Sequence, residues 1–162
     1  METALDARAK VYFAVMNSGG VRDSIAAGEV TYKDVLTVQP FGNILTYTDM
    51  SGQEVMDYLN VVATKPVDSG AYAQFAGISM TVADGKVSNV FIGGKQLRLD
   101  ETYRFTVPSF NASGGDGYPK LMGHPGFVNT GFVDAEVLKE YLESNSPIDV
   151  NKYAPSGEIV YK

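Results

Sequence analysis

The segment Tyr103-Arg-Phe-Thr-Val-Pro-Ser-Phe-Asn-Ala-Ser-Gly-Gly-Asp-Gly-Tyr118 contains the two signals from which the fold of this 162-residue chain can be predicted. Its first part alternates apolar and polar residues, with Tyr103, Phe105 and Val107 on one side, and this pattern is typical of a β-strand. Its second part, from Phe110 onward, is rich in glycine and predicts a loop. A strand that runs into a glycine-rich loop is therefore expected here.

Further strands are predicted on both sides of this segment. Apolar β-type residues lead into Asp84-Gly85, a dipeptide that strongly favours a hairpin turn, and Gly93-Gly94 predicts a second turn. The strands expected from these patterns cover residues 11–16, 44–50, 75–82, 87–92, 103–107 and 158–161.

Helices are predicted from their capping residues. Thr31 precedes a short helix over 32–36, and Ser51 with Glu54 forms a capping box before an apolar face at helical spacing. Asp134 is expected to be the N-cap of the last helix, which would bury Val137, Leu138, Tyr141 and Leu142. Mixed strands and helices with at least two hairpins indicate the α+β class.

The charge balance argues against one class of partner. The chain has 13 Lys and Arg against 19 Asp and Glu, which gives a net charge of -6. Nucleic-acid grooves need a basic stripe, so no nucleic-acid partner is expected. One or two local arginines could still hold the phosphate of a small nucleotide.

The side chains that bind metals are scarce. The chain has no cysteine and one histidine, His124, whereas a dinuclear hydrolase needs several clustered His and carboxylate ligands. No metal site is therefore expected in this chain, and His124, beside Pro125, is predicted to lie on the surface. No apolar stretch is long enough to span a membrane. The sequence after Met1 lacks the apolar region of a signal peptide, so we interpret the chain as part of a longer protein.

Three loops combine glycine with a polar or aromatic group. In the first, Gly19 and Gly20 allow close backbone approach, and Arg22 offers a planar fork for phosphate or carboxylate. The residues alone leave a second interpretation equally open, in which the loop is a plain turn and Arg22 pairs with Asp23 or another acid.

The other two loops each carry a phenylalanine. Phe41 and Phe110 could stack on a flat ligand, or each could be a lid over the core. Asp116, between Gly115 and Gly117, could accept hydrogen bonds from the hydroxyls of a ribose or could bond its own backbone in a turn. The residues alone do not decide between these alternatives.

Taken in order, the three loops resemble the C-terminal domain of the 5'-nucleotidase family, and most of all that of the bacterial periplasmic UDP-sugar hydrolase/5'-nucleotidase group. The resemblance is carried by Asn17-Ser-Gly-Gly-Val-Arg-Asp-Ser-Ile-Ala-Ala-Gly28, Tyr32-Lys-Asp-Val-Leu-Thr-Val-Gln-Pro-Phe-Gly-Asn43 and Phe110-Asn-Ala-Ser-Gly-Gly-Asp-Gly-Tyr-Pro119. Segments 68–72, 129–139 and 146–150 extend it. Any one of these motifs is weak, but all of them in one register are highly specific.

The resemblance implies a fold and an activity. It implies a single substrate-binding domain over residues 1–162, with a four-layer α-β-β-α arrangement. The family's enzymes carry two divalent metal ions on an N-terminal metallophosphatase domain, which is absent from this chain. The whole enzyme would hydrolyse nucleotides or UDP-sugars, and the chain alone would bind nucleosides weakly and hydrolyse nothing.

The resemblance also implies a set of substrate-binding residues. Phe41 and Phe110 match the two rings that hold the base between them. Asp116 matches the carboxylate that binds the ribose hydroxyls. Asn43 and Gly70 match polar contacts to the edge of the base.

Two residues match the phosphate side of the family's site, namely Arg22 and Asn17. The family uses further arginines on a helix upstream of the strand at Val11, and these are absent from this chain. The resemblance places the whole enzyme in the periplasm or at the cell surface. An alternative from a different class is a free-standing module that binds nucleosides without catalysis, and another is a structural domain whose loops are only turns.

Overall fold

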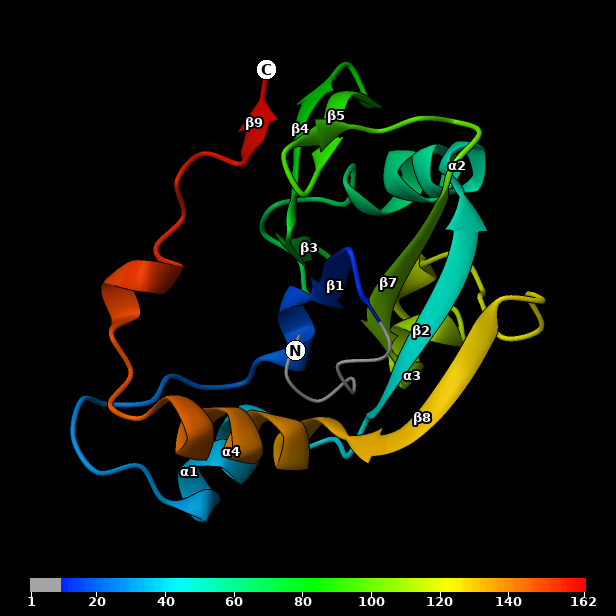
Figure 1. The fold of residues 1–162 in the computed structure, drawn as a ribbon. Coiled ribbons are helices and arrows are strands. Elements are labelled where there is room, and N and C mark those ends of the chain that lie inside the picture. Colours follow the sequence, from blue (N-terminus) through cyan, green and yellow to red (C-terminus); the bar gives the residue numbers. More distant parts are fainter. Residues whose placement is uncertain (1–9) are drawn as a thin grey trace.

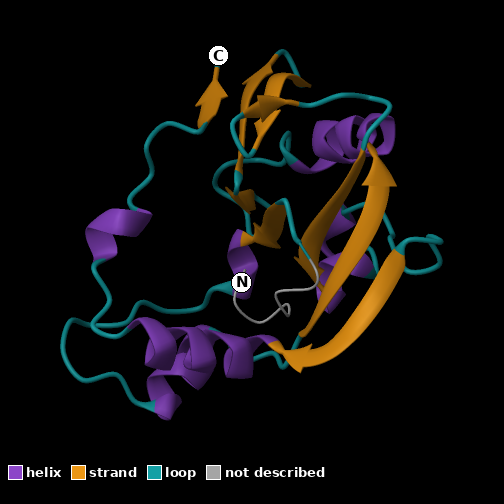
Figure 2. Cartoon of the chain, viewed as in Figure 1, coloured by secondary structure: helices purple, strands orange, loops and turns teal. Residues whose placement is uncertain are grey.

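The computed structural model describes residues 10–162, which form two β-sheets and several helices (Figures 1 and 2). The larger sheet has the strand order β3 (Ala73–Ala76), β1 (Phe13–Asn17), β7 (Thr102–Pro108), β2 (Ile44–Ser51) and β8 (Phe127–Val133). The smaller sheet has the order β6 (Lys95–Gln96), β5 (Lys86–Ile92), β4 (Ile78–Ala83) and β9 (Ile159–Tyr161).

The helices separate into two groups. The pair α1 (Tyr32–Val38) and α4 (Asp134–Asn145) lies together at one end of the view in Figure 1, whereas α2 (Gly52–Val62) lies at the other end. The short helix α3 (Ser109–Ala112) follows β7 directly. Single 3₁₀ turns occur at η1 (Ser18–Gly20), η2 (Gly115–Gly117) and η3 (Val150–Tyr153).

The two sheets and α2 share one hydrophobic core. Phe13 of β1 stacks on Phe105 of β7, with ring centroids 4.8 Å apart, and Tyr58 of α2 lies 5.0 Å from the same Phe105 ring. The apolar residues of β4 and β5 complete this core from the smaller sheet. The core thus lies on one face of the five-stranded sheet and leaves the other face to α4.

Local capping sets where two helices begin. Thr31 and Asp34 form a capping box at α1, and Ser51 and Glu54 form one at α2, with side chain and backbone bonded in both directions. Each box satisfies amide groups that the first helical turn leaves without partners. Both boxes consist of residues close in sequence, and the predicted starts of both helices are confirmed.

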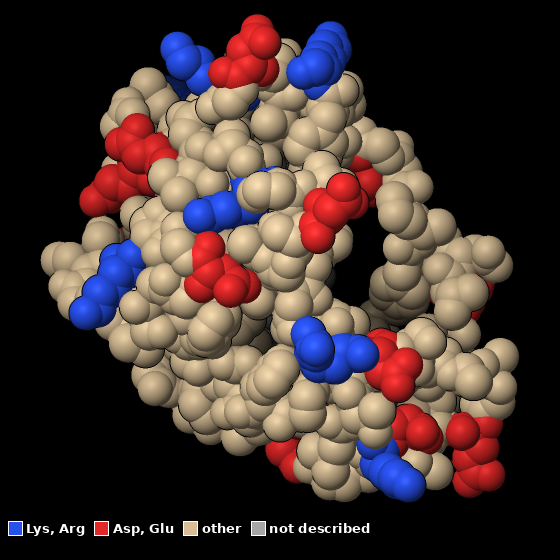
Figure 3. All heavy atoms as spheres, turned by 180° about the vertical axis from the view of Figure 1, so that it is seen from behind, with Lys and Arg blue, Asp and Glu red and all other residues tan. Residues whose placement is uncertain are grey.

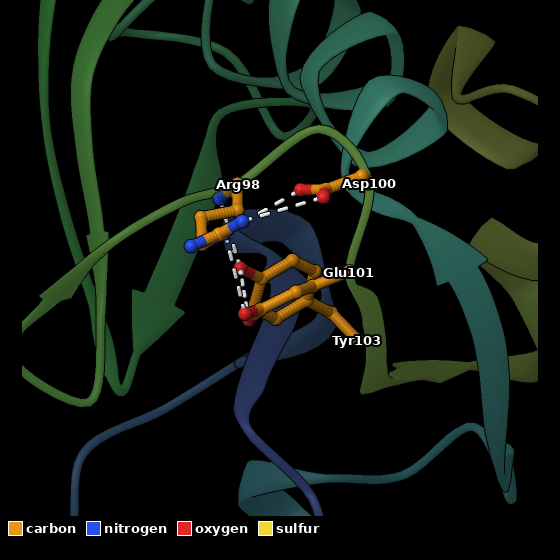
Figure 4. Close-up of polar contacts among 4 residues, drawn as sticks. All are labelled: Arg98, Asp100, Glu101 and Tyr103. Atoms are coloured by element: carbon orange, nitrogen blue, oxygen red, sulfur yellow. Dashed lines mark hydrogen bonds and ion pairs between the residues drawn. The ribbon is translucent and has the colours of Figure 1, made fainter.

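A charged turn leads from the smaller sheet into β7 (Figure 4). Arg98 pairs with Asp100 and Glu101, and its backbone N–H donates to the hydroxyl of Tyr103 at 2.9 Å. The turn packs against the start of α2, where a Cβ atom on Gly52 would lie 2.0 Å from the Arg98 carbonyl oxygen. Only glycine at position 52 allows this approach between the turn and the helix.

The α+β class and the two sheets flanked by helices confirm the fold expected from the sequence. The hairpin at Asp84-Gly85 is also confirmed, because Ala83 pairs with Lys86 across it. The predicted strands over 11–16, 44–50, 103–107 and 158–161 correspond to β1, β2, β7 and β9 with small shifts at their ends.

One strand was missed, and three local expectations were wrong. Strand β8 was not predicted, and Phe110 lies in the short helix α3 rather than in a loop. Asp134 is the first residue of α4, and Val133 is its N-cap. In α4 the side chains of Leu138, Tyr141 and Leu142 are only half-buried, because this helix lies at the outside of the sheet.

Candidate functional site

Four segments of the chain meet at one end of the larger sheet. The N–H of Gly19 donates to the carbonyl of Gly70 at 2.8 Å, and the amide of Asn17 donates to the Asp116 carboxylate at 2.7 Å. The N–H of Phe110 donates to Asn43 Oδ1 at 3.3 Å. The loops expected to carry the site are therefore bonded to one another, although they are far apart in sequence.

The first segment continues from β1. Asn17 is the last residue of that strand and is buried, with a relative exposure of 5%. The turn Ser18–Gly20 then brings the backbone of Gly19 against Gly70, so closely that a Cβ atom on Gly19 would lie 3.2 Å from the Gly70 oxygen. Gly70, matched to a contact with the base edge, is thus in direct contact with the first loop.

Arg22 follows this turn and lies beside Phe41. Its guanidinium carbon is 5.9 Å from the centre of the Phe41 ring, and its Nη1 is 3.5 Å from the Gly19 carbonyl oxygen. The carboxylate of Asp23 accepts instead from the N–H of Ser24 at 2.8 Å. Between residues 10 and 162 there is no ion pair between Arg22 and Asp23 or any other acidic side chain.

The two phenylalanines of the loops are exposed. Phe41 has a relative exposure of 59% and Phe110 of 45%, whereas the core ring of Phe105 is fully buried. Neither ring is therefore buried in the hydrophobic core. The Phe110 ring packs against the backbone of Gly115, where a Cβ atom would lie 2.6 Å from the ring carbon Cζ.

Asp116 lies in a backbone conformation that suits few residues. Its φ angle is +56°, and Gly114 and Gly117 beside it also have positive φ. A non-glycine residue in this region is uncommon, with Asp and Asn several-fold enriched. The carboxylate is exposed apart from the bond from Asn17, so it remains available as an acceptor.

Two residues that were not predicted hold the glycine-rich loop in place. The buried Tyr118 donates from its hydroxyl to the Ala71 carbonyl at 2.9 Å, and burial raises the pKa of this hydroxyl. Lys65 donates from Nζ to the Gly117 carbonyl at 2.9 Å. Tyr118 directly follows the glycines, so its position in the sequence indicates that it belongs to the glycine-rich loop. The sequence around Lys65 gives no indication of its contact with that loop.

Asn43 is occupied by contacts within the protein. Besides the Phe110 N–H, its Oδ1 lies 3.5 Å from the hydroxyl of Ser109, and its backbone carbonyl accepts from the N–H of the buried Asp134 at 2.8 Å. Burial raises the pKa of Asp134, and the bonds from Ala135 and Asn43 oppose that rise. In this structure Asn43 therefore fixes the Phe110 loop to the start of α4.

The histidine expected on the surface is in fact half-buried and bonded. His124 Nε2 lies 3.2 Å from Glu54 Oε1, and the N–H of Gly126 donates to its Nδ1 at 3.0 Å. Because Nδ1 accepts, Nε2 is the nitrogen that donates to the carboxylate. Among residues 10–162 no group of three or more His, Cys, Asp or Glu side chains is placed to hold a metal ion.

A cavity of about 430 Å³ lies between the larger sheet and α4, and Met16 and Gln39 form part of its lining. It is bounded by β1, β7 and α4 and by Tyr153 on the segment that leads to β9, where the molecule is hollowed in the space-filling view (Figure 3). Its lining includes none of the seven residues matched to the family's site. The seven residues of the loop cluster thus lie outside this cavity.

The surface has no strongly charged region in the view of Figure 3, where acidic and basic side chains are interspersed. None of the helices within residues 10–162 has the length and apolar character that crossing a bilayer requires. The loop cluster presents two exposed aromatic rings, one cation and one carboxylate, which are groups suited to binding a ligand.

Known proteins resemble this chain closely. The family model described as 5'-nucleotidase, C-terminal domain, matches residues 1–123. A 5'-nucleotidase of Vibrio vulnificus (strain CMCP6) is 90% identical over 155 residues, which are 96% of this chain and 28% of that protein. The protein UshA of Escherichia coli (strain K12) is 55% identical over 150 residues, which are 93% of this chain and 27% of that protein.

A solved structure agrees with these sequences. The 5'-nucleotidase precursor from Thermus thermophilus superposes with a TM-score of 0.82 at 31% identity, covering 93% of this chain and 31% of that one. The chain thus spans less than a third of the length of the relatives reported above. From the match of the family model and the shared fold, the chain belongs to the 5'-nucleotidase C-terminal domain family.

Proposed function

We propose that residues 1–162 form the nucleoside-binding domain of a longer 5'-nucleotidase or UDP-sugar hydrolase. Phe41 and Phe110 clamp the base, and Asp116 binds the ribose hydroxyls. Arg22 binds the phosphate. The ligands are nucleotides, nucleosides or UDP-sugars.

The observation that carries this proposal is the exposure of two phenylalanine rings, Phe41 in a loop and Phe110 in α3, on segments that are bonded together. Exposed large apolar side chains gain nothing from the core, so a pair of them in one loop cluster favours a ligand site. Phe41 lies next to Gly42 and Asn43, and Asn43 bonds the backbone of Phe110. Stacking on an aromatic ring is worth about 1–3 kcal/mol per base, and it tolerates different bases because every base has a π-face.

The charges of the cluster suit the remainder of a nucleotide. Arg22 supplies the planar donor set that matches phosphate oxygens. Asp116 supplies acceptors for hydroxyl groups. Both residues are bonded to segment 17–19, Arg22 through Gly19 and Asp116 through Asn17. A ligand with an anionic end and a diol is therefore favoured over a simple aromatic compound.

The rest of the enzyme is proposed from the relatives. We propose that an N-terminal metallophosphatase domain holds two divalent metal ions and cleaves the phosphate, and that the enzyme is located in the periplasm or at the cell surface. The described residues do not fit such a metal centre, since no cluster of three ligating side chains is present between residues 10 and 162. This chain would present the substrate, and no reaction step is assigned to it.

The clamp is tested by replacing either ring with leucine, which keeps apolar bulk but removes the flat π-surface. Phe41→Leu and Phe110→Leu are each expected to cost adenosine affinity by about 1–3 kcal/mol. The melting temperature should stay near that of the wild type because both rings are exposed. Calorimetric titration and thermal unfolding are measured on the same samples.

Phe91→Leu is the matched control, because Phe91 is also exposed, at 39%, but lies on β5 outside the loop cluster. It should leave adenosine binding unchanged. Two stable loop variants that bind adenosine as the wild type does would refute the clamp.

A further inference from the structure

Asn17 occupies a protected place at the centre of the loop cluster. It is 5% exposed, and its side chain lies beneath the turn at Gly19 and Gly20. A Cβ atom on Gly20 would lie 3.1 Å from Asn17 Oδ1, and one on Gly19 would lie 3.4 Å from Nδ2. The absence of side chains on both glycines makes room for the amide, which is held in one orientation.

The held amide is directed at Asp116. Asn17 Nδ2 donates to Asp116 Oδ2 at 2.7 Å, across 99 positions of sequence. Among the described residues, no second hydrogen bond to this carboxylate occurs. The backbone of Asp116 is in the left-handed region between glycines, where the chain is intrinsically permissive, so the amide is the contact that fixes the carboxylate.

A neutral amide donor suits a binding carboxylate. An ionised carboxylate has about four lone-pair sites, and one bond from Asn17 leaves the others free. An Arg or Lys partner would neutralise the charge, whereas an amide orients the group and leaves it anionic. The free oxygen can then accept two charge-assisted hydrogen bonds from vicinal hydroxyls.

We propose that Asn17 is a positioning residue that orients Asp116 toward the 2'- and 3'-hydroxyls of a ribose. This rests on the proposed function and changes the role matched to Asn17, which was a contact on the phosphate side. A phosphate beside Nδ2 would lie next to the Asp116 carboxylate and be repelled by it. The Asn17 donor is also engaged by that carboxylate, which leaves the phosphate to Arg22.

The test compares two ligands that differ only in the diol. Adenosine and 2',3'-dideoxyadenosine are titrated by calorimetry into the wild-type chain, Asn17→Ala and Asp116→Ala. Asn17→Ala is expected to weaken adenosine about tenfold, which is the usual net effect of one hydrogen bond, and to leave dideoxyadenosine unchanged. In the Asp116→Ala background, the same change at Asn17 should cause no further loss.

The control variant is Asn145→Ala, in which an exposed asparagine at the end of α4 loses its bond to the Tyr141 carbonyl. It should bind both nucleosides as the wild type does. Equal weakening of both nucleosides by Asn17→Ala would overturn the positioning role. A loss of affinity for AMP without a loss for adenosine would also overturn it, because Asn17 would then contact the phosphate.

A second measurement covers the case in which Asn17→Ala does not fold. In the wild type, the side-chain amide protons of Asn17 should exchange slowly with solvent, and Asp116→Ala should speed that exchange and shift their NMR signals. If Asp116→Ala changes neither the exchange rate nor the NMR signals of the Asn17 side-chain amide, the proposal would also be overturned. A folded wild type that binds no adenosine would overturn the proposed function and this inference together, whereas binding with no diol selectivity would overturn the inference alone.

Discussion

At the scale of single residues, Arg22 has the contacts expected of a ligand-binding cation. Its guanidinium lies over the exposed face of Phe41 and near the Gly19 carbonyl, and between residues 10 and 162 it makes no ion pair. A cation over an exposed ring contributes only about 0.5–1 kcal/mol. That contact alone accounts for little of the stability of the fold, and we propose that Arg22 also binds the phosphate of a ligand.

Replacing Arg22 by alanine is therefore expected to weaken AMP far more than adenosine. Hydrogen bonds to charged groups are worth about 1.5–3 kcal/mol, which corresponds to a loss of roughly tenfold to a hundredfold for AMP. Adenosine lacks the phosphate and should lose only the small effect of the uncovered Phe41 ring. Calorimetric titration of both ligands gives the two affinities.

Lys33→Ala serves as the control, since Lys33 is an exposed cation on α1 and equals Arg22 in charge. If it lowers AMP affinity as much as Arg22→Ala does, the effect is one of general charge. Equal weakening of AMP and adenosine by Arg22→Ala, or a lower melting temperature without selectivity, would show that the arginine is structural.

At the scale of elements, the start of α2 is connected to the loop that precedes β8. The Glu54 carboxylate bonds the backbone and hydroxyl of Ser51 through Oε2 and contacts His124 through Oε1. The backbone and side-chain bonds from Ser51, together with His124, hold the pKa of Glu54 below its ordinary value of 4.5. The charged form of Glu54 is thus the one that the folded state favours.

Replacing Glu54 by glutamine should therefore destabilise the chain in a pH-dependent way. Since the folded pKa is the lower one, the stabilisation is present above pH 4.5 and is lost as the pH falls through the depressed pKa. At neutral pH the loss should be about 0.3–1 kcal/mol, the usual contribution of a negative charge in the first turn of a helix. Urea unfolding of both proteins between pH 7 and pH 3 measures the difference.

Val61→Ala, on the exposed side of the same helix, should shift stability equally at all pH values. A constant gap between wild type and Glu54→Gln down to pH 3 would mean that the carboxylate charge contributes nothing.

The elements differ in how well their sequences predict them. Helices α1 and α2 were predicted because each capping box lies within four residues, so local chemistry suffices. Strand β8 was missed because its sequence, Phe127-Val-Asn-Thr-Gly-Phe-Val133, shows no alternation and few of its side chains are buried. It is an edge strand, and its pairing with β2 rather than its own pattern makes it a strand.

At the scale of the whole molecule, the loops of the site were predictable but their connections were not. Glycine, asparagine and phenylalanine marked the three loops locally. The bonds from Asn17 to Asp116 and from Lys65 to Gly117 join positions 99 and 52 residues apart, and only the folded sheet brings them together. The exposure of Phe41 and Phe110 likewise depends on the fold, since a phenylalanine in a loop usually covers the core.

We propose that this chain binds the substrate and that another domain of the enzyme cleaves it, and this leads to a prediction about catalysis. The purified 162-residue chain should release no phosphate from AMP, with or without added Mn²⁺, Zn²⁺ or Mg²⁺. Two-metal hydrolysis needs several ligating side chains around each ion. This chain has one histidine, which is engaged with Glu54 and Gly126, and residues 10–162 contain no cluster of three potential ligands.

Release of inorganic phosphate is measured over a metal series, with adenosine binding checked on the same samples so that inactivity cannot be blamed on misfolding. Trace phosphatase from the expression host is the main source of a false signal. Asp116→Ala, prepared identically, controls for it, because a contaminant is indifferent to this substitution. Metal-dependent release that the wild type shows and Asp116→Ala lacks would mean that this chain carries a catalytic centre of its own, and the proposed division between a binding domain and a metal-bearing domain would be wrong.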